Sequence, residues 1–288
     1  MKLVIKHLVK YNFIFVCLFF AFVSCEKDLD TRIEVSPKLC FNCILNPDSL
    51  IKGSLSLSRS ISEAGAFVKI NHATVELKKD GQFIGLMQNT GNGIYGLTFK
   101  PCSGSIYELT IKAEGFPELH ASTKVPEKPS VSCLLNDSVR IYGYTNYLTT
   151  YTIHDRLGEN HYWQFKIENR FGRKEFVVYH YDINSVIIDD FNKVTDATDK
   201  LGFHYEYYLR INDNGLDGKI LTYTDLTHPK DCISFMDTDV HYDKYMKSSI
   251  KQKVNEYNST FSEPVQIYTN IENGLGIFGS AAITSFKL

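Results

Sequence analysis

Alternation of apolar and polar side chains is the feature that most restricts the fold of this chain. Short alternating segments recur about every ten residues, at 54–60, 73–79, 82–87, 94–99 and 107–113. Side chains of a strand point alternately to its two faces, so each segment predicts a strand with one buried face. Turn residues such as Asp80-Gly81 separate the segments. The pattern predicts an immunoglobulin-like β-sandwich over residues 50–126.

A proline-containing segment indicates a domain boundary near residues 126–130. Pro126 and Pro129 exclude this segment from a central strand, because proline cannot donate a ladder hydrogen bond. After the boundary the chain is rich in tyrosine, and its aromatic and β-branched residues favour further strands. We therefore expect a second β-rich domain over residues 130–288.

One segment of the second half has helical periodicity. Apolar and aromatic side chains recur there at intervals of three and four residues, namely Tyr245, Met246, Ile250, Val254 and Tyr257. This spacing predicts a helix over residues 243–257 with one buried face, and Asp243 can serve as its N-cap. The predicted fold class is therefore mainly β, with a single helix in the C-terminal half.

Residues 1–24 have the composition of a signal peptide. Three lysines and no acid occupy residues 1–10, and an almost wholly apolar run follows over residues 11–23. The run is shorter than the ~20 apolar residues that a membrane-spanning helix needs, but it fits the core of a signal peptide. Ser24-Cys25 then resembles the processing site of bacterial lipoproteins, at which the cysteine receives lipid. An ordinary secretory signal with an incidental Cys25 is the alternative.

Lipidation of Cys25 would decide how the mature chain is attached. Removal of residues 1–24 takes away three lysines and no acid, which moves the formal net charge from −2 to −5. Charge therefore does not favour acidic lipid headgroups, and attachment is expected through acyl chains on Cys25. Residues 25–49 would form the anchor and tether. The acids in residues 26–30 resemble the surface-export signal of Bacteroidota lipoproteins, so we expect a lipid-anchored outer-membrane protein exposed at the cell surface.

Five cysteines remain after such processing, which leaves at least one thiol unpaired. Cys40 and Cys43 have CxxC spacing, but no second pair or histidine set follows at the spacing of a zinc site. A redox motif would lie between a strand and a helix, whereas this one precedes a predicted hairpin. Outside the cytoplasm, the favoured interpretation is a disulfide from Cys40 or Cys43 to Cys102 or Cys133. Buried thiols are the structural alternative.

Few residues suggest a ligand. Asp213 and Asp217 lie in a segment that partly matches a calcium loop, although a tight turn explains the same residues. Tyr144 and Trp163 could stack on a sugar or a peptide; packing of these rings within a strand face is the alternative. Neither a nucleophile elbow nor a zinc-protease helix motif is present. We expect no catalytic residues, no further metal site and no cofactor.

The segment from Asn270 to Gly279 joins an Asn/Gly turn to a glycine-spaced apolar stretch, and it lacks the register of a phosphate loop. Together with Cys25, the strand-rich first half and the late helix, it resembles a Bacteroidota lipoprotein family labelled domain of unknown function 4249. The resemblance covers nearly the whole mature chain and carries over no catalytic residue. It implies a cell-envelope role, because members are often encoded beside TonB-dependent outer-membrane transporters.

These features predict a non-enzymatic accessory or binding protein that works beside a TonB-dependent transporter. An adhesin or structural envelope protein is the alternative. An uncharacterised hydrolase is a lesser alternative, because it would need a concave site with convergent polar groups. The charge balance gives no reason to expect a nucleic-acid partner. The expected partners are the membrane, through lipid on Cys25, and the transporter.

Overall fold

The computed structural model confirms a mainly β chain with one helix among the residues it describes. These are residues 36–60, 63–141, 144–158, 160–170, 173–176, 208–211, 218–227, 231–257 and 265–288. The expected signal segment 1–24 and Cys25 lie outside them. Pro37–Arg59 and Gly65–Leu288 form one compact unit, which contains every labelled strand.

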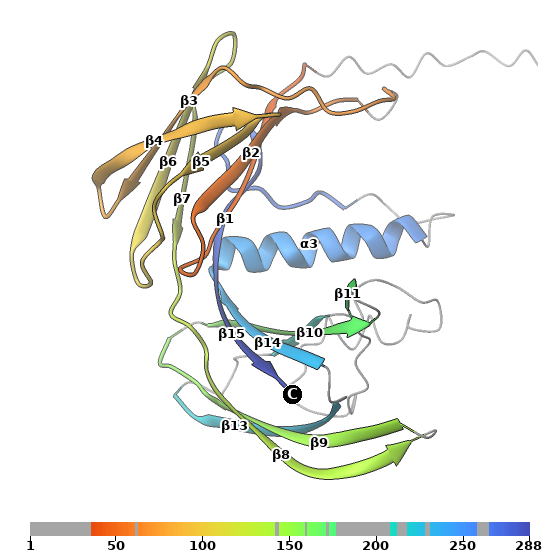
Figure 1. Ribbon diagram of the computed structural model, residues 1–288. Coiled ribbons are helices and arrows are strands. Elements are labelled where there is room, and N and C mark those ends of the chain that lie inside the picture. Colours follow the sequence, from red (N-terminus) through yellow and green to blue (C-terminus); the bar gives the residue numbers. More distant parts are fainter. Residues whose placement is uncertain are drawn as a thin grey trace, which may run out of the picture. The chain divides into compact units, whose positions relative to one another are not determined.

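The strands of the first half form two sheets that share β4 (Figure 1). They are β1 (Leu39–Leu45), β2 (Ile51–Leu57), β3 (Ala73–Lys79), β4 (Gln82–Gly91), β5 (Ile94–Leu97), β6 (Ile106–Ala113) and β7 (Leu119–Lys124). The first residues of β4 pair with β3 and its last residues pair with β5. The order β1-β2-β5-β4 therefore passes into β4-β3-β6-β7, and the two sheets enclose one core. This arrangement confirms the sandwich that the alternation predicts.

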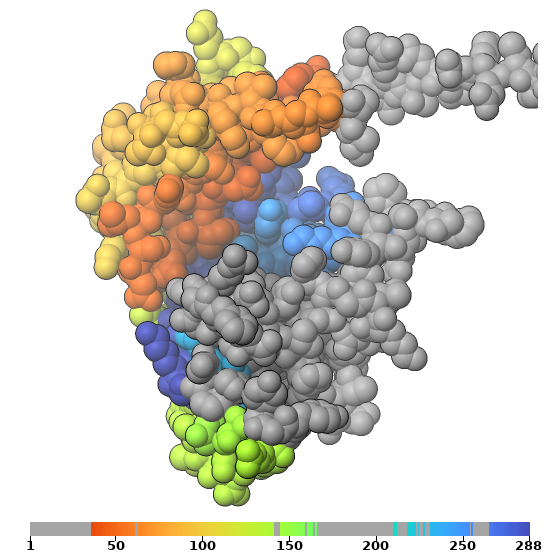
Figure 2. Space-filling model, turned by 45° about the vertical axis from the view of Figure 1, so that its right-hand side comes forward, coloured from red at the N-terminus to blue at the C-terminus, as the bar shows by residue number. Residues whose placement is uncertain are grey.

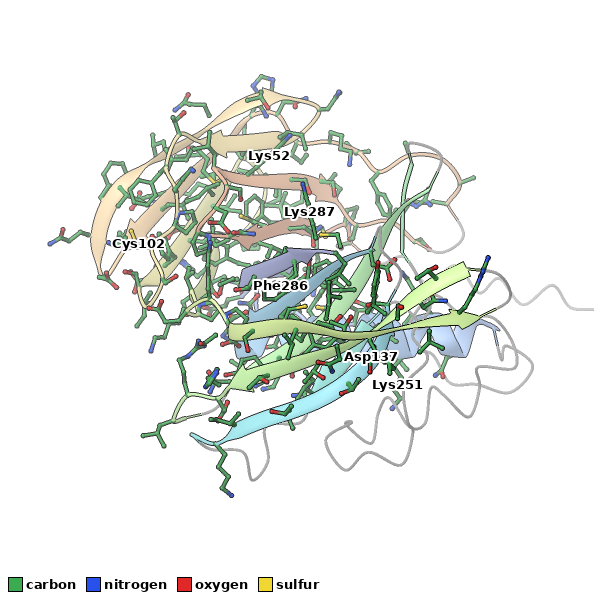
Figure 3. The ribbon with its side chains drawn as sticks, turned by 60° about the horizontal axis from the view of Figure 1, so that its bottom comes forward. Lys52, Cys102, Asp137, Lys251, Phe286 and Lys287 are labelled. Atoms are coloured by element: carbon green, nitrogen blue, oxygen red, sulfur yellow. The ribbon has the colours of Figure 1, made fainter. Side chains whose placement is uncertain are left out.

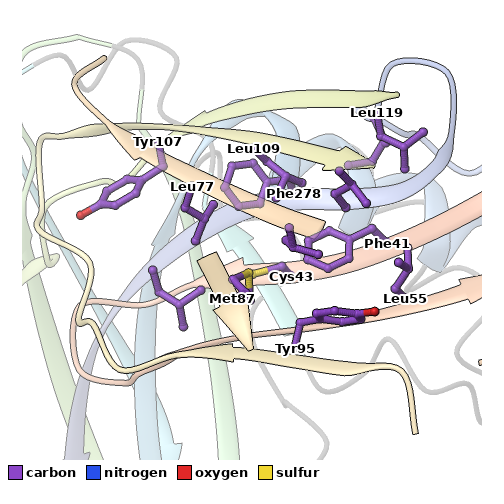
Figure 4. Packing of buried hydrophobic residues seen from close by; sticks show 14 of the residues in the cluster. Phe41, Cys43, Leu55, Leu77, Met87, Tyr95, Tyr107, Leu109, Leu119 and Phe278 are labelled. Atoms are coloured by element: carbon purple, nitrogen blue, oxygen red, sulfur yellow. The ribbon is translucent and has the colours of Figure 1, made fainter. Parts of the chain in front are cut away.

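Alternation places one face of each of these strands in the shared core. Phe41 in β1, Leu77 in β3 and Leu109 in β6 are each at most 1% exposed, and Figure 4 shows their side chains in one cluster. The intervening residues of these strands are more exposed, as the period of two requires. Each fully buried aliphatic or aromatic side chain stabilises such a core by about 1.5–3 kcal/mol.

The predicted turn at Asp80-Gly81 is confirmed, and Asn92-Gly93 forms a second turn of the first half. Asp80 and Gly81 have φ values of 50° and 78°, and Asn92 and Gly93 have values of 52° and 69°. Aspartate, asparagine and glycine adopt this left-handed region most readily, which is why such pairs connect twisted strands. Gly93 also lacks room for a side chain, because a Cβ atom there would lie 2.3 Å from the carbonyl oxygen of Leu55.

The second half contains two sheets and the helix. One sheet has the order β13-β9-β8, and the other continues from β15 through β14 and β10 to β11, with β12 also paired to β10. Their bounds are β8 (Ser130–Ile141), β9 (Tyr144–His154), β10 (His161–Arg170), β11 (Arg173–Phe176), β12 (Tyr208–Ile211), β13 (Ile220–Thr227), β14 (Asp231–Thr238) and β15 (Leu275–Lys287). Tyr151 of β9 packs on Phe235 of β14, with ring centroids 5.2 Å apart. The opposite face of β10 and β14 packs on the helix.

The helix, α3 (Val240–Tyr257), begins three residues before the predicted start. Its N-cap is Asp239, whose Oδ1 atom accepts the Tyr242 amide hydrogen bond at 2.9 Å. The predicted cap, Asp243, instead lies inside the first turn, where its side chain is 3% exposed. Both aspartates can cap a helix, and the choice depends on contacts with β15 that local sequence does not contain. Met246 and Ile250 lie in the predicted apolar face and pack on the sheet.

The C-terminal strand β15 corrects the predicted extent of the tether. Residues 39–45, which we assigned to the tether 25–49, form β1 and pair in parallel with β15 from Cys40–Leu275 to Leu45–Ser280. β15 also pairs with β14 of the second half. Gly276 permits the close approach, since a Cβ atom there would lie 2.1 Å from the carbonyl oxygen of Phe41. The boundary at 126–130 stays a prediction; the two halves that it separates share one strand.

Candidate functional site

Trp163 is not a stacking platform, contrary to one interpretation of the sequence. Its side chain is 0% exposed and lies between β10 and α3. Its Nε1–H group donates a hydrogen bond of 2.9 Å to Oδ1 of Asp243. The other interpretation, a ring packed on a strand face, is therefore the correct one. Tyr144 begins β9, but its side chain lies outside the described residues, as do Asp213 and Asp217 of the expected calcium loop.

The structure contradicts the expected disulfide, because all five described cysteines are free thiols. Cys40 and Cys43 point to opposite faces of β1, because they are an odd number of residues apart. Cys43 is 2% exposed in the core, and burial raises the pKa of its thiol to about 12. Cys102 is exposed at the periphery (Figure 3), and Cys133 belongs to the separate sheet of β8. Cys43 is therefore a buried thiol, which was the structural alternative to the disulfide.

The outer face of β3, β6 and β7 carries a polar hollow of about 610 Å³, which we call the β3-β6-β7 hollow. It is lined by Glu76, Lys78, Glu108, Leu109, Thr110, Lys112, Glu118, His120, Ala121, Ser122, Asn270 and Glu272. The strands supply these groups because their alternate residues point away from the core, where Val75 and Leu77 are buried. The lining therefore offers donors, acceptors and both signs of charge, and it contains no Phe, Tyr or Trp side chain.

The strand register brings residues from distant parts of the chain into rows across the hollow. Glu76 of β3 is opposite Thr110 of β6, and Thr110 is opposite His120 of β7. A second row runs from Lys78 through Glu108 to Ser122 in the same way. Directly opposed side chains of neighbouring strands lie about 4.5–5.5 Å apart at Cβ, so each row forms one continuous polar surface.

Contacts between the rows give the hollow a partly ordered electrostatic pattern. Glu118 forms an ion pair with Nζ of Lys112 at 3.3 Å, and its other carboxylate oxygen lies 3.5 Å from Nε2 of His120. Lys78 and Glu76 are 3.8 Å apart. The side chains in these pairs are 33–63% exposed, and exposed pairs of this kind stabilise a fold by only about 0–1 kcal/mol. Their charges are therefore available to an incoming ligand at little cost to the fold.

The C-terminal segment forms one wall of the hollow. Nδ2 of Asn270 donates to the carbonyl oxygens of Ser122 and Phe278 at 3.2 and 2.8 Å, and its Oδ1 atom accepts the Phe278 amide at 3.0 Å. Nδ2 of Asn273 donates to the carbonyl oxygen of Glu118 at 3.1 Å. The unusual Asn270-to-Gly279 sequence thus fixes the edge of β7, and it brings Asn270 to the hollow.

Thr110, His120 and Glu118 follow one another along the hollow. Oγ1 of Thr110 lies 3.5 Å from Nδ1 of His120, whose Nε2 atom faces Glu118. This is a hydroxyl–imidazole–carboxylate row, but the distances are at the upper limit for hydrogen bonds and water reaches all three groups. Among the described residues, no three His, Cys, Asp or Glu side chains are placed to hold a metal ion.

The second half contains one buried ion pair and a second pair in which only the aspartate is buried. Nε of Arg210 donates to Oδ1 of Asp243 at 2.8 Å, with both residues at most 7% exposed. Burial alone would raise the pKa of Asp243, but the hydrogen bond and charge of Arg210 outweigh it and lower that pKa. Arg156 binds Asp237, whose other oxygen accepts the His161 amide at 3.1 Å. There burial prevails over both partners and raises the pKa of Asp237 to about 6.

The sequence indicated which residues of the first half face outward, but it did not identify the hollow. Alternation assigns Glu76, Thr110 and His120 to exposed faces, whereas their common row depends on pairings across 34 and 10 residues. Asn270 reaches the hollow through a hydrogen bond to β7, a strand that lies about 150 residues earlier in the chain. Within the described part of the chain, no helix has the length and apolar character needed to cross a bilayer.

Fold and site together define a sandwich-bearing, mainly β protein with a polar hollow on one outer sheet face. The chain belongs to a family described as domain of unknown function (DUF4249), whose sequence profile matches residues 26–287. The match begins directly after Cys25 and includes every labelled strand and α3. No curated protein matches the chain at a significant level.

Proposed function

We propose that this protein is an outer-membrane lipoprotein that binds a hydrophilic ligand as a non-enzymatic accessory of a TonB-dependent transporter. The observation that carries the binding role is the β3-β6-β7 hollow, which presents hydroxyl, imidazole and charged groups on a rigid sheet. Lipid on Cys25 is the proposed anchor, supported by the apolar run before that residue. Surface exposure, a Bacteroidota source and a role in nutrient uptake belong to the same proposal.

The geometry favours recognition of a ligand rich in hydroxyl or charged groups. The lining supplies carboxylates at Glu76 and Glu108 and hydroxyls at Thr110 and Ser122. Such groups orient a ligand by hydrogen bonds, and sites on strands hold their positions more precisely than sites on loops. Without a Phe, Tyr or Trp side chain in the lining, affinity would rest on polar contacts.

A deletion strain tests this proposal. The strain is complemented with the full chain, with Ser122→Arg, which would fill the hollow, or with Lys52→Ala, which changes an exposed residue outside it. We expect slower growth of the deletion strain on a panel of polysaccharides and peptides, restored by the full chain and by Lys52→Ala but not by Ser122→Arg. A tagged full chain should also recover a TonB-dependent transporter from detergent-extracted outer membranes.

Two outcomes would contradict the proposal. Normal growth of the deletion strain on the whole panel, with altered attachment to surfaces, would favour the adhesin or structural role. Recovery of the tagged chain without any transporter would refute the proposed partner. Equal complementation by Ser122→Arg would show that the hollow is not the binding site.

A further inference from the structure

A small apolar surface lies in the chain that follows β2. Phe67 is 50% exposed and Val68 is 60% exposed. The segment is nevertheless fixed to β2, because the Leu57 amide donates to the Val68 carbonyl oxygen at 2.9 Å and the Ile70 amide donates to that of Leu55 at 3.2 Å. The two apolar side chains are therefore held in water by the fold, and such exposure often marks an interaction site.

Cationic side chains surround this apolar pair. The guanidinium group of Arg59 lies 4.7 Å from the centroid of the Phe67 ring and donates to the Gly65 carbonyl oxygen. Lys69 follows directly and is exposed, and residues 65–72 contain no acid. The mature chain would be anionic, yet this surface is locally cationic. Apolar tips flanked by lysine and arginine suit the boundary between lipid headgroups and acyl chains.

The described chain begins beside the same surface. The Lys38 amide donates to Oγ of Ser58 at 2.9 Å, and the Ser58 amide donates to the Lys38 carbonyl oxygen at 2.8 Å. Register pairs Leu39 with Leu57, so the start of β1 and the end of β2 lie at one end of the sheet (Figure 1). In Figure 2 the red and orange atoms of these segments form a continuous surface.

The length of the tether keeps this end of the molecule close to any anchor on Cys25. Eleven residues lie between Cys25 and Pro37, and an extended chain spans at most about 3.3–3.6 Å per residue. Pro37, which lies next to the start of β1, is therefore held within roughly 40 Å of Cys25. Leu50, another exposed apolar residue, lies just before β2 and thus at the opposite end of that strand.

We propose that this surface is a membrane-contacting patch, formed by Phe67, Val68, Arg59, Lys38 and Lys69. Phe67 and Val68 insert into the headgroup boundary of the leaflet that holds the Cys25 lipid, and the three cations pair with lipid phosphates. This inference rests on the proposed lipid anchor and adds an orientation to it. The patch alone binds weakly and reversibly, because a single shallow contact contributes far less than acyl chains.

Vesicle binding by the mature chain with Cys25→Ala tests the patch separately from the anchor. The probe is a vesicle of phosphatidylethanolamine and phosphatidylglycerol, and bound protein is measured by co-sedimentation. We expect binding that Phe67→Ser with Val68→Ser reduces by about fivefold or more, since insertion of apolar groups contributes much of the affinity. Phe83→Ser is the matched control, because Phe83 is a comparably exposed aromatic residue (59%) outside the patch.

A second variant tests the electrostatic part. Arg59→Gln with Lys69→Gln should reduce binding to these vesicles and should abolish the difference between them and vesicles of phosphatidylcholine alone. Unchanged thermal unfolding of both double variants would show that the fold is intact. Equal binding by the Phe67/Val68 variant and the Phe83 control, or no binding at millimolar lipid, would overturn the patch. Those results would leave lipidation unaffected, because the tested chain carries no lipid.

Discussion

The two halves of the chain bury different kinds of side chain. In the first half the shared core is apolar, and Thr123 is the one buried polar residue described between 36 and 125. The second half buries five aspartates, His161 and Arg210 between residues 155 and 243. A purely apolar core is stabilised by area and packing and is nearly independent of pH. A core with charges depends on each partner being present and correctly placed, so the halves should respond differently to mutation and to pH.

The largest loss of stability is expected from Asp243→Ala in the second half. This change leaves Arg210 buried without its carboxylate and removes the acceptor of the Trp163 indole hydrogen bond. Loss of one partner of a buried pair costs about 3–5 kcal/mol, which chemical denaturation would measure. Asp48→Ala is the control, since the exposed Asp48–Lys128 pair should contribute little. A loss below that of the control would show that the buried pair does not stabilise the fold.

In the first half, Leu77→Ala should destabilise the protein by about 2–5 kcal/mol. Leu77 is 0% exposed, and its truncation removes apolar contacts and leaves a cavity. The loss should be the same at pH 5 and pH 8, because the cluster around Leu77 contains no charged group. Leu86→Ala, at a residue that is 41% exposed, should cost much less. A pH-dependent effect of Leu77→Ala would contradict the contrast between the halves.

Gly276→Ala tests the strand that joins the halves. Gly276 has φ of +101°, and a Cβ atom there would lie 2.1 Å from a carbonyl oxygen of β1. Strain and steric overlap should together cost about 2–3 kcal/mol. Gly115→Ala provides the comparison, because Gly115 also has positive φ (+79°) but has open space around it. Equal thermal stabilities of the two variants would argue against the β1–β15 contact.

An effect that depends on pH is expected from Asp237→Asn. Because burial raises the pKa of Asp237 to about 6, the folded protein holds a proton between about pH 4 and 6 that the unfolded chain has released. Stability should therefore fall as pH rises through this window, by about 3 kcal/mol from this group. The variant should lose this slope in unfolding measurements made from pH 4 to 7. Parallel pH profiles of the two proteins would refute the shift.

The same contrast explains how much of the structure could be predicted from sequence. Alternation and local turns such as Asp80-Gly81 specify the first half, because neighbouring residues carry the signal. The pairs of the second half join residues about 80 positions apart, as in Trp163 with Asp243 and Arg156 with Asp237. Spacing along one segment cannot identify such partners. Local spacing therefore predicts Asp243 as the helix cap, where the structure has Asp239, and it permits an exposed Trp163.

The candidate site follows the same rule. Outward-facing residues on β3, β6 and β7 are evident from alternation, but their alignment requires the register. The parallel pairing of β1 with β15 joins residues near the two ends of the described chain, so the local sequence of residues 39–45 does not distinguish a strand from a tether.

We propose that lipid on Cys25 attaches this protein to the outer membrane. Intact mass and peptide mass spectrometry of the protein extracted from isolated outer membranes would test it most directly. We predict a mature chain that begins at Cys25 and carries acyl groups on that residue, and release of the Cys25→Ala variant from the membrane fraction. An unmodified N-terminus at another residue, or a Cys25→Ala variant that remains in washed membranes, would contradict the account.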